Sequence, residues 1–202
     1  MTDAYHTVAE PATSRFEVQG SEFLGHVRPV ESVDDAEAFV DTVEAEYADA
    51  THNVPAYRVR TDADGDFLRE YSSDDGEPSG SAGKPALNVL QGQELENVAV
   101  VVTRYYGGTN LGVGGLVSAY GRAVSEAVEA AGVVAERPHE QLSVGVAYDD
   151  SGTVRGILES ERYEFDAEYA ADVSFDVRVP AAEAEALRDR LRSATSGRVE
   201  IE

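Results

Sequence analysis

The spacing of apolar residues in the first part of the chain predicts strand structure on either side of one helix. Residues 15–30 carry apolar positions two apart, with a break at Gly20, a spacing typical of strands. Ser32 precedes an apolar stripe with helical spacing, and its side chain is placed to cap the free N–H groups of a helix start. Residues 54–60 and 67–71 are predicted to be two strands joined by an aspartate-rich turn.

The middle of the sequence combines the longest apolar run with a glycine-rich turn. A short helix is predicted over residues 79–91, after a polar loop. Residues 97–106 are almost continuously apolar, as expected for a strand buried on both faces. A long helix is predicted over residues 114–131, where an apolar stripe recurs at helical spacing until Gly132.

The last third of the sequence has the pattern of a separate small domain. Residues 135–141 contain Pro138 and several charges, and are predicted to be a linker. The segments beyond it alternate as β, α, β, β, α, β over residues 142–148, 151–160, 163–169, 173–179, 181–193 and 197–201. This order is the ferredoxin-like, split-βαβ plan.

The sequence therefore predicts an α+β protein of two domains. The first fourteen residues are polar and are expected to be a flexible lead. The full division is a lead over 1–14, an N-terminal domain over 15–134, a linker over 135–141 and a C-terminal domain over 142–202.

Composition adds an unusual charge balance. Among 202 residues, 39 acidic side chains face 16 basic ones, the formal net charge is −23, and Lys84 is the only lysine. Acids spread along the whole sequence favour adaptation to high salt over an acidic tail or a specific acidic partner. The same charge disfavours loose, phosphate-driven binding of nucleic acid.

Several classes of protein are excluded or disfavoured. The absence of cysteine excludes disulfides, thiolate catalysis and cysteine-ligated zinc. No apolar run approaches the roughly 20 residues needed to span a bilayer. The N-terminus lacks the basic start and apolar stretch of a signal peptide. We expect a cytoplasmic protein with no membrane partner.

A glycine-rich segment, residues 104–115, joins the buried strand to the long helix. Glycines let the backbone turn sharply and approach a ligand, and the helix N-terminus offers unpaired N–H groups to an anion. The segment matches neither standard nucleotide-binding fingerprint, and its glycines and tyrosines could equally serve tight packing. The candidate binding residues here are Arg104, Tyr105, Tyr106, Gly107, Gly108, Asn110, Gly112, Gly114 and Gly115.

Local charge marks the same region. Residues 83–132 hold four acidic and three basic side chains, a net charge of −1, so the other 152 residues hold −22. A nearly neutral stretch in so acidic a protein is either core or a functional face.

An acidic loop is the second candidate. Asp74, Asp75, Glu77 and Ser79 precede the predicted short helix, and the carboxylates could hold magnesium beside a phosphate. They could equally form a turn, with a serine as helix cap.

His52 stands just before a strand, where a catalytic base could sit, but a lone histidine is more often a structural hydrogen-bonding residue. No required cofactor, metal site or catalytic set is evident, and a non-enzymatic protein is favoured.

These residues also carry a resemblance to a known family. The runs Asp74-Asp75-Gly76-Glu77-Pro78-Ser79-Gly80 and Arg104-Tyr105-Tyr106-Gly107-Gly108 resemble those of the IMPACT family, in its prokaryotic, two-domain YigZ branch. The resemblance implies an N-terminal domain like the second domain of small-subunit ribosomal protein five. It also implies a C-terminal domain like the last domain of elongation factor G. Eukaryotic members regulate translation.

Three functions stay open. The first is a non-enzymatic regulator or binding protein, translation-related, whose partner is the ribosome, RNA or a translation-related protein. The second is a protein or enzyme that binds a nucleotide or other phosphate ligand, with magnesium, through the glycine-rich turn. The third is a protein-binding domain that uses Tyr105 and Tyr106.

Overall fold

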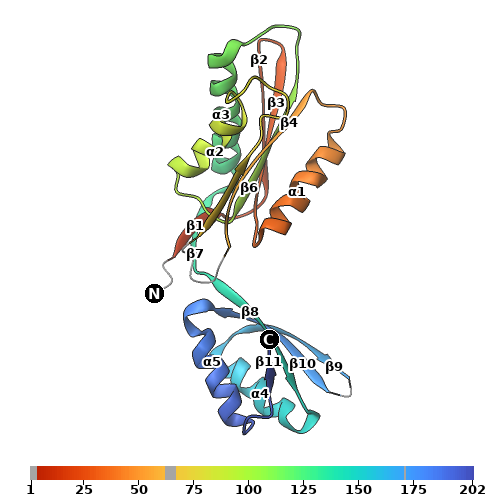
Figure 1. The fold of residues 1–202 in the computed structure, drawn as a ribbon, viewed down its shortest axis with the longest axis vertical. Helices are drawn as coiled ribbons and strands as arrows, with labels where there is room; N and C mark the ends of the chain where they lie inside the picture. Colours follow the sequence, from red (N-terminus) through yellow and green to blue (C-terminus); the bar gives the residue numbers. More distant parts are fainter. Residues whose placement is uncertain (1–3, 62–66, 171) are drawn as a thin grey trace. The chain divides into compact units, whose positions relative to one another are not determined.

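The computed structural model of the protein describes residues 4–61, 67–170 and 172–202. It contains two compact units, Ala4–Glu136 and Arg137–Glu202 (Figure 1). The division falls between residues 136 and 137, whereas most of the segment predicted as a linker, residues 135–141, belongs to the strands Val133–Glu136 and His139–Val146. The aspartate-rich turn expected at residues 62–66 lies outside the described residues.

The N-terminal unit is built on an antiparallel sheet of five strands in the order β2-β3-β6-β4-β5. A separate two-stranded ribbon pairs β1 with β7. The strands are β1 (Tyr5–Val8), β2 (Ala12–Val18), β3 (Ser21–Pro29), β4 (His52–Arg60), β5 (Leu68–Ser72), β6 (Val98–Tyr105) and β7 (Val133–Glu136). The helices are α1 (Val33–Glu46), α2 (Gly83–Gly92) and α3 (Gly112–Ala131).

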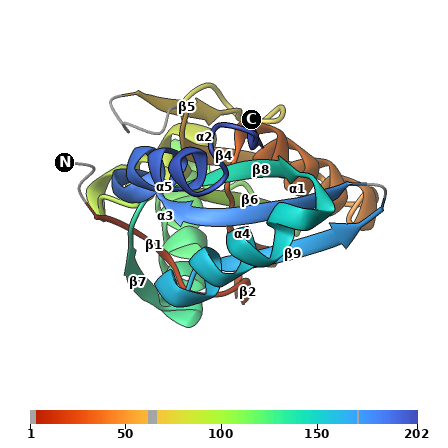
Figure 2. The same ribbon diagram turned by 90° about the horizontal axis from the view of Figure 1, so that it is seen from below.

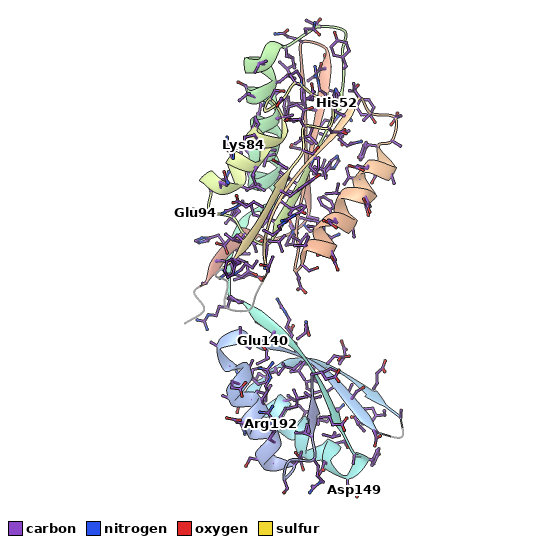
Figure 3. All side chains as sticks on the ribbon, in the orientation of Figure 1. His52, Lys84, Glu94, Glu140, Asp149 and Arg192 are labelled. Atoms are coloured by element: carbon purple, nitrogen blue, oxygen red, sulfur yellow. The ribbon has the colours of Figure 1, made fainter. Side chains whose placement is uncertain are left out.

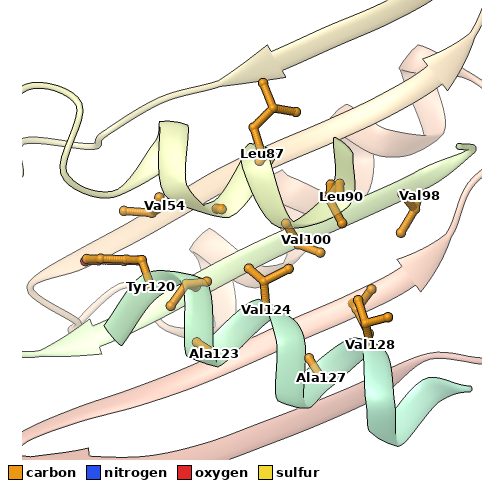
Figure 4. Close-up of a cluster of buried hydrophobic side chains, with 14 of the residues drawn as sticks. Val54, Leu87, Leu90, Val98, Val100, Tyr120, Ala123, Val124, Ala127 and Val128 are labelled. Carbon is orange, nitrogen blue, oxygen red and sulfur yellow. The ribbon is translucent and has the colours of Figure 1, made fainter. Parts of the chain in front are cut away.

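Helices cover both faces of this sheet, α1 on one face and α2 with α3 on the other (Figure 1). The apolar run of β6 explains the arrangement, since its side chains alternate between two cores. Val98, Val100 and Val102 join the core under α2 and α3, whereas Ala99 and Val101 pack toward α1. Figure 4 shows the first of these cores, where apolar side chains of α2 and α3 pack against those of β4 and β6.

The two-residue turn between β2 and β3 is a tight hairpin. Gln19 and Gly20 both have positive φ, at 50° and 82°, as a type I′ turn requires. Ser32 caps α1 as predicted, accepting the N–H of Asp35 at 3.0 Å. Both features follow from local chemistry that the sequence makes visible.

The flexible lead expected over residues 1–14 needs correction. Residues from Tyr5 onward form β1 and the start of β2, and β1 pairs along its whole length with β7. Tyr5, Thr7 and Val8 are buried. The sequence did not predict β1, because the segment around it is polar and its partner strand, β7, lies far along the sequence. The first three residues lie outside the described part.

The C-terminal unit has the expected βαββαβ order. An antiparallel sheet of strand order β11-β8-β10-β9 carries both helices on one face (Figure 2). Its elements are β8 (His139–Val146), α4 (Tyr148–Glu161), β9 (Glu164–Tyr169), β10 (Val173–Pro180), α5 (Ala181–Ala194) and β11 (Glu200–Ile201). The ferredoxin-like plan is confirmed.

The other face of this second sheet is polar and acidic. Buried side chains alternate along β10 with more exposed ones, Asp176 among them. Asp166 of β9 lies directly opposite Asp176, and two like charges in that position repel each other. A face of this charge repels the phosphates of a nucleic acid. Within the described residues, no helix is both long enough and apolar enough to cross a membrane.

Candidate functional site

Arg104 stands near the end of β6 and points into the protein. By alternation it lies on the same face as Val100 and Val102, and only 4% of its surface is exposed. Its Nη1 donates to Oε1 of Glu77 at 2.5 Å, and its Nη2 donates to Oγ of Ser21 at 3.2 Å. The guanidinium also lies 5.5 Å from the ring centres of Phe23 and Tyr106.

Glu77 is the hub of this cluster. It is buried, and Oε1 also accepts the hydroxyl hydrogen of Tyr120 at 2.7 Å. Its other oxygen, Oε2, lies 3.8 Å from Nε2 of His52, which is labelled in Figure 3. Burial raises the pKa of Tyr120, with a further contribution from the hydrogen bond to Glu77 and its charge, while Arg104 opposes the shift. The acidic loop and the end of β6 therefore meet in one buried network.

The other two acidic residues of the loop, Asp74 and Asp75, accept hydrogen bonds from main-chain N–H groups. Asp74 accepts N–H groups of Gly80, Ala82 and Gly83 at 2.7, 3.1 and 2.9 Å, so it caps the start of α2. The predicted helix start at residue 79 is therefore wrong by four residues, since α2 begins at Gly83. Ser79 is exposed and precedes the helix.

Asp75 fixes the start of β4. Its Oδ2 accepts the N–H of Asn53 at 2.6 Å, and its main-chain oxygen lies 2.6 Å from Nδ1 of His52. A carbonyl oxygen only accepts, so Nδ1 of His52 carries the proton and donates it there. His52 is thereby oriented with Nε2 toward Glu77.

Replacing Asp74 with alanine is expected to destabilise the N-terminal unit by about 1–2 kcal/mol at neutral pH, because it removes the cap of α2. Burial would raise the pKa of Asp74, but the three backbone N–H groups outweigh it and hold the pKa below that of an ordinary aspartate. A carboxyl with a lowered folded-state pKa stabilises above its unfolded pKa. The difference between wild type and variant should therefore shrink as the pH falls below about 4.

Urea unfolding across that pH range measures the effect. Ser79→Ala is the matched control in the same loop and should leave stability unchanged within about 0.5 kcal/mol. An Asp74→Ala protein as stable as wild type at neutral pH would contradict the capping role.

The glycine-rich turn is attached to the β2–β3 hairpin at one point. A Cβ added to Gly107 would lie 1.9 Å from the carbonyl carbon and the carbonyl oxygen of Gly20, so the two backbones touch. The N–H of Gly107 donates to Oγ of Ser21 at 3.2 Å, and that of Tyr106 donates to Oγ1 of Thr51 at 2.9 Å. A side chain at Gly107 cannot be accommodated without moving the hairpin.

The rest of the turn faces solvent. Gly108, Asn110, Gly112 and Gly114 are exposed, while Gly115 is partly buried against Leu111. Within the described residues, α3 begins at Gly112 and its free N–H groups receive no side-chain cap. The exposed apolar side chains here are Tyr106 at 46%, Val113 at 59% and Val117 at 40%, which we call the turn surface.

The two neighbouring tyrosines have different surroundings. Tyr105 lies on the opposite face of β6 from Arg104, and its hydroxyl donates to Oδ1 of Asp49 at 2.9 Å. Tyr106 follows the strand, and its hydroxyl donates to Oδ1 of Asn110 at 3.0 Å.

Sequence reasoning missed two members of the buried network, Ser21 and Tyr120. The helical spacing predicts Tyr120 to lie on the apolar stripe of the long helix, and Ser21 falls in a predicted strand. The available signal was a hydroxyl on an otherwise apolar stripe, which often marks a buried hydrogen bond.

Across the described ranges, no group of three or more histidines and acids is placed to hold a metal ion.

Comparison with known proteins identifies the family. The Impact N-terminal domain model matches residues 19–128, and a domain of unknown function, DUF1949, matches residues 144–198. The chain belongs to the IMPACT family.

Other IMPACT family members resemble it over nearly their whole length. The chain is 32% identical to IMPACT family member YvyE of Bacillus subtilis, covering 100% of this chain and 91% of that protein. It is 33% identical to YigZ of Escherichia coli, covering 96% and 94%. A crystal structure described as a hypothetical protein shares 32% identity and a TM-score of 0.71, covering 100% of this chain and 97% of the other.

Similarity to a eukaryotic IMPACT protein is confined to about half of the sequence. Protein IMPACT of Rattus norvegicus is 37% identical over 94 residues, which cover 46% of this chain and 29% of the rat protein.

Proposed function

We propose that this IMPACT-family protein is a non-enzymatic, translation-related regulator that binds a protein partner through the turn surface. The proposal is supported by the orientation of the motif residues. Arg104 and Glu77 turn inward and bind each other, while Tyr106 and Val113 face solvent. Arg104 and Glu77 are thus buried, while the apolar side chains of the turn surface are exposed.

Charge favours a protein partner over RNA at this surface. The turn surface belongs to the stretch of net charge −1, so apolar contact there is little affected by the acidity of the whole protein. Apolar contact also persists at high salt, where attraction to phosphate is screened. A partner within translation is suggested by the eukaryotic relatives, which are known as translation regulators.

A phosphate ligand is the second candidate function. It is favoured by the uncapped start of α3 and by the open space around Gly108, Gly112 and Gly114. Arg104, however, is engaged by Glu77 below the surface, so the ligand would be held by backbone N–H groups.

Co-sedimentation with ribosomes and their associated factors in molar potassium chloride tests the first function. Tyr106→Ala with Val113→Ser should lower the bound fraction by about tenfold, because aromatic and apolar anchors dominate such contacts. Tyr148→Ala with Tyr169→Ala is the matched control, since both rings are exposed, at 66% and 53%, on the C-terminal unit.

Absence of co-sedimentation, or equal loss in both double variants, would contradict the proposal. A thermal shift on adding inorganic phosphate or ATP with magnesium would favour the second candidate.

A further inference from the structure

A groove of about 360 Å³ opens on the α1 face of the N-terminal sheet. Its helical wall is formed by Glu37, Asp41 and Glu44, spaced so that all three lie on one side of α1. The opposite wall comes from β4, β5 and the acidic loop. This is the other face of the sheet from the core under α2 and α3, so the groove is distinct from the turn surface.

Two tyrosines form an aromatic wall of the groove. Tyr57 of β4 and Tyr71 of β5 lie opposite each other in the sheet, with ring centres 5.1 Å apart and nearly parallel. Tyr57 is buried and donates its hydroxyl to Glu37 at 3.3 Å, whereas Tyr71 is 42% exposed. The ring of Tyr71, stacked on the buried Tyr57, is therefore partly open to an occupant beside the carboxylates.

Negative charge in the groove is poorly balanced. Among the described residues that line it, four carboxylates stand against one basic side chain, Arg69. Burial raises the pKa of Glu44, and the charges of Asp75 and Asp41 add to the shift. Crowding of this kind is relieved by a cation placed among the carboxylates.

The groove combines carboxylates with an aromatic ring, and this distinguishes it from other acidic surfaces of the protein. Asp166 and Asp176 are also paired across neighbouring strands, but both are exposed on the sheet and, among the described residues, no aromatic ring is paired with them. Carboxylates alone would suit an inorganic ion, whereas an aromatic face beside them suits a cation that carries carbon. The volume is at the lower end for small-molecule pockets.

We propose that this groove binds an organic cation, an alkylguanidinium or alkylammonium group, whose charge pairs with Asp41 and Glu44 while its carbon atoms lie against Tyr71. Two sources share this chemistry, a free polyamine and an arginine or lysine side chain of a bound polypeptide. At high salt the long-range attraction is screened, so the close aromatic contact provides much of the selectivity.

Calorimetric titration of the full-length protein with spermidine and with a hexa-arginine peptide tests the proposal. Asp41→Asn with Glu44→Gln should weaken binding by about tenfold, and Tyr71→Leu by several-fold. Asp166→Asn with Asp176→Asn removes the same charge elsewhere, and should leave the affinity unchanged. Asp41, Glu44 and Tyr71 are exposed, so the variants should fold, and melting curves check this.

The two probes separate the sources. Binding of spermidine that is lost in the groove variants supports a free polyamine, and tighter binding of the peptide with the same loss supports a polypeptide partner. No binding of either probe, or equal weakening in the control variant, would overturn the proposal. The turn-surface variants should bind both probes normally, so this test stands apart from that of the proposed function.

Discussion

Replacing Arg104 with methionine is expected to lower the free energy of unfolding of the N-terminal unit by about 3–5 kcal/mol. The substitution keeps much of the side-chain packing against Phe23 but removes both hydrogen-bonding arms. Glu77 would then be a buried carboxylate without its cationic partner. Denaturant unfolding in molar potassium chloride measures the loss.

The double variant Arg104→Met with Glu77→Gln distinguishes an ion pair from simple packing. If the pair is the cause, the double variant should be more stable than Arg104→Met alone, because the glutamine leaves no unpaired charge and can still accept from Tyr120. Additive losses from the two single variants would contradict the buried pair as the source of the effect.

Replacing Gly107 with alanine is expected to cost more than about 3 kcal/mol, or to prevent folding of the N-terminal unit. The added Cβ would overlap main-chain atoms of Gly20, and backbone cannot rotate aside in the way that flexible side chains do. Thermal unfolding followed by far-ultraviolet circular dichroism measures the change.

Gly114→Ala is the matched control, since the same methyl group is added seven residues later in the first turn of α3. Among the described residues nothing lies within 4 Å of that Cβ, and alanine favours helix, so stability should rise by up to about 1 kcal/mol. Equal melting temperatures for Gly107→Ala and wild type would show that the hairpin moves away freely.

The elements that the sequence predicted well are those fixed by local chemistry. The apolar run of β6 is a strand buried on both faces, as continuous apolar residues indicate, and Ser32 caps α1 three residues away. The family resemblance rested on the acidic loop and the Arg104 segment, and the family models match the protein on both of its units.

What the sequence could not provide are the contacts between segments that only the folded protein brings together. Asp74 caps α2 from nine residues before Gly83, a longer separation than any capping pattern includes, so the sequence offers only a nearby serine as the alternative cap. Tyr105 and Tyr106 are neighbours in sequence, but β6 ends at Tyr105, and their hydroxyls bond to side chains of different segments, Asp49 and Asn110. The meeting of Glu77 with Arg104 was left open because it requires the tertiary fold.

The contact between the glycine-rich turn and the β2–β3 hairpin has a consequence for when the turn surface exists. The hydrogen bond from Gly107 to Ser21 closes a loop of 86 residues, and contacts of such separation form only after much of the polypeptide has collapsed. A nascent or partly unfolded molecule therefore does not present this surface in its final geometry. A partner that binds this surface would therefore bind folded molecules and not partly folded ones. Binding would then depend on completed folding of the N-terminal unit.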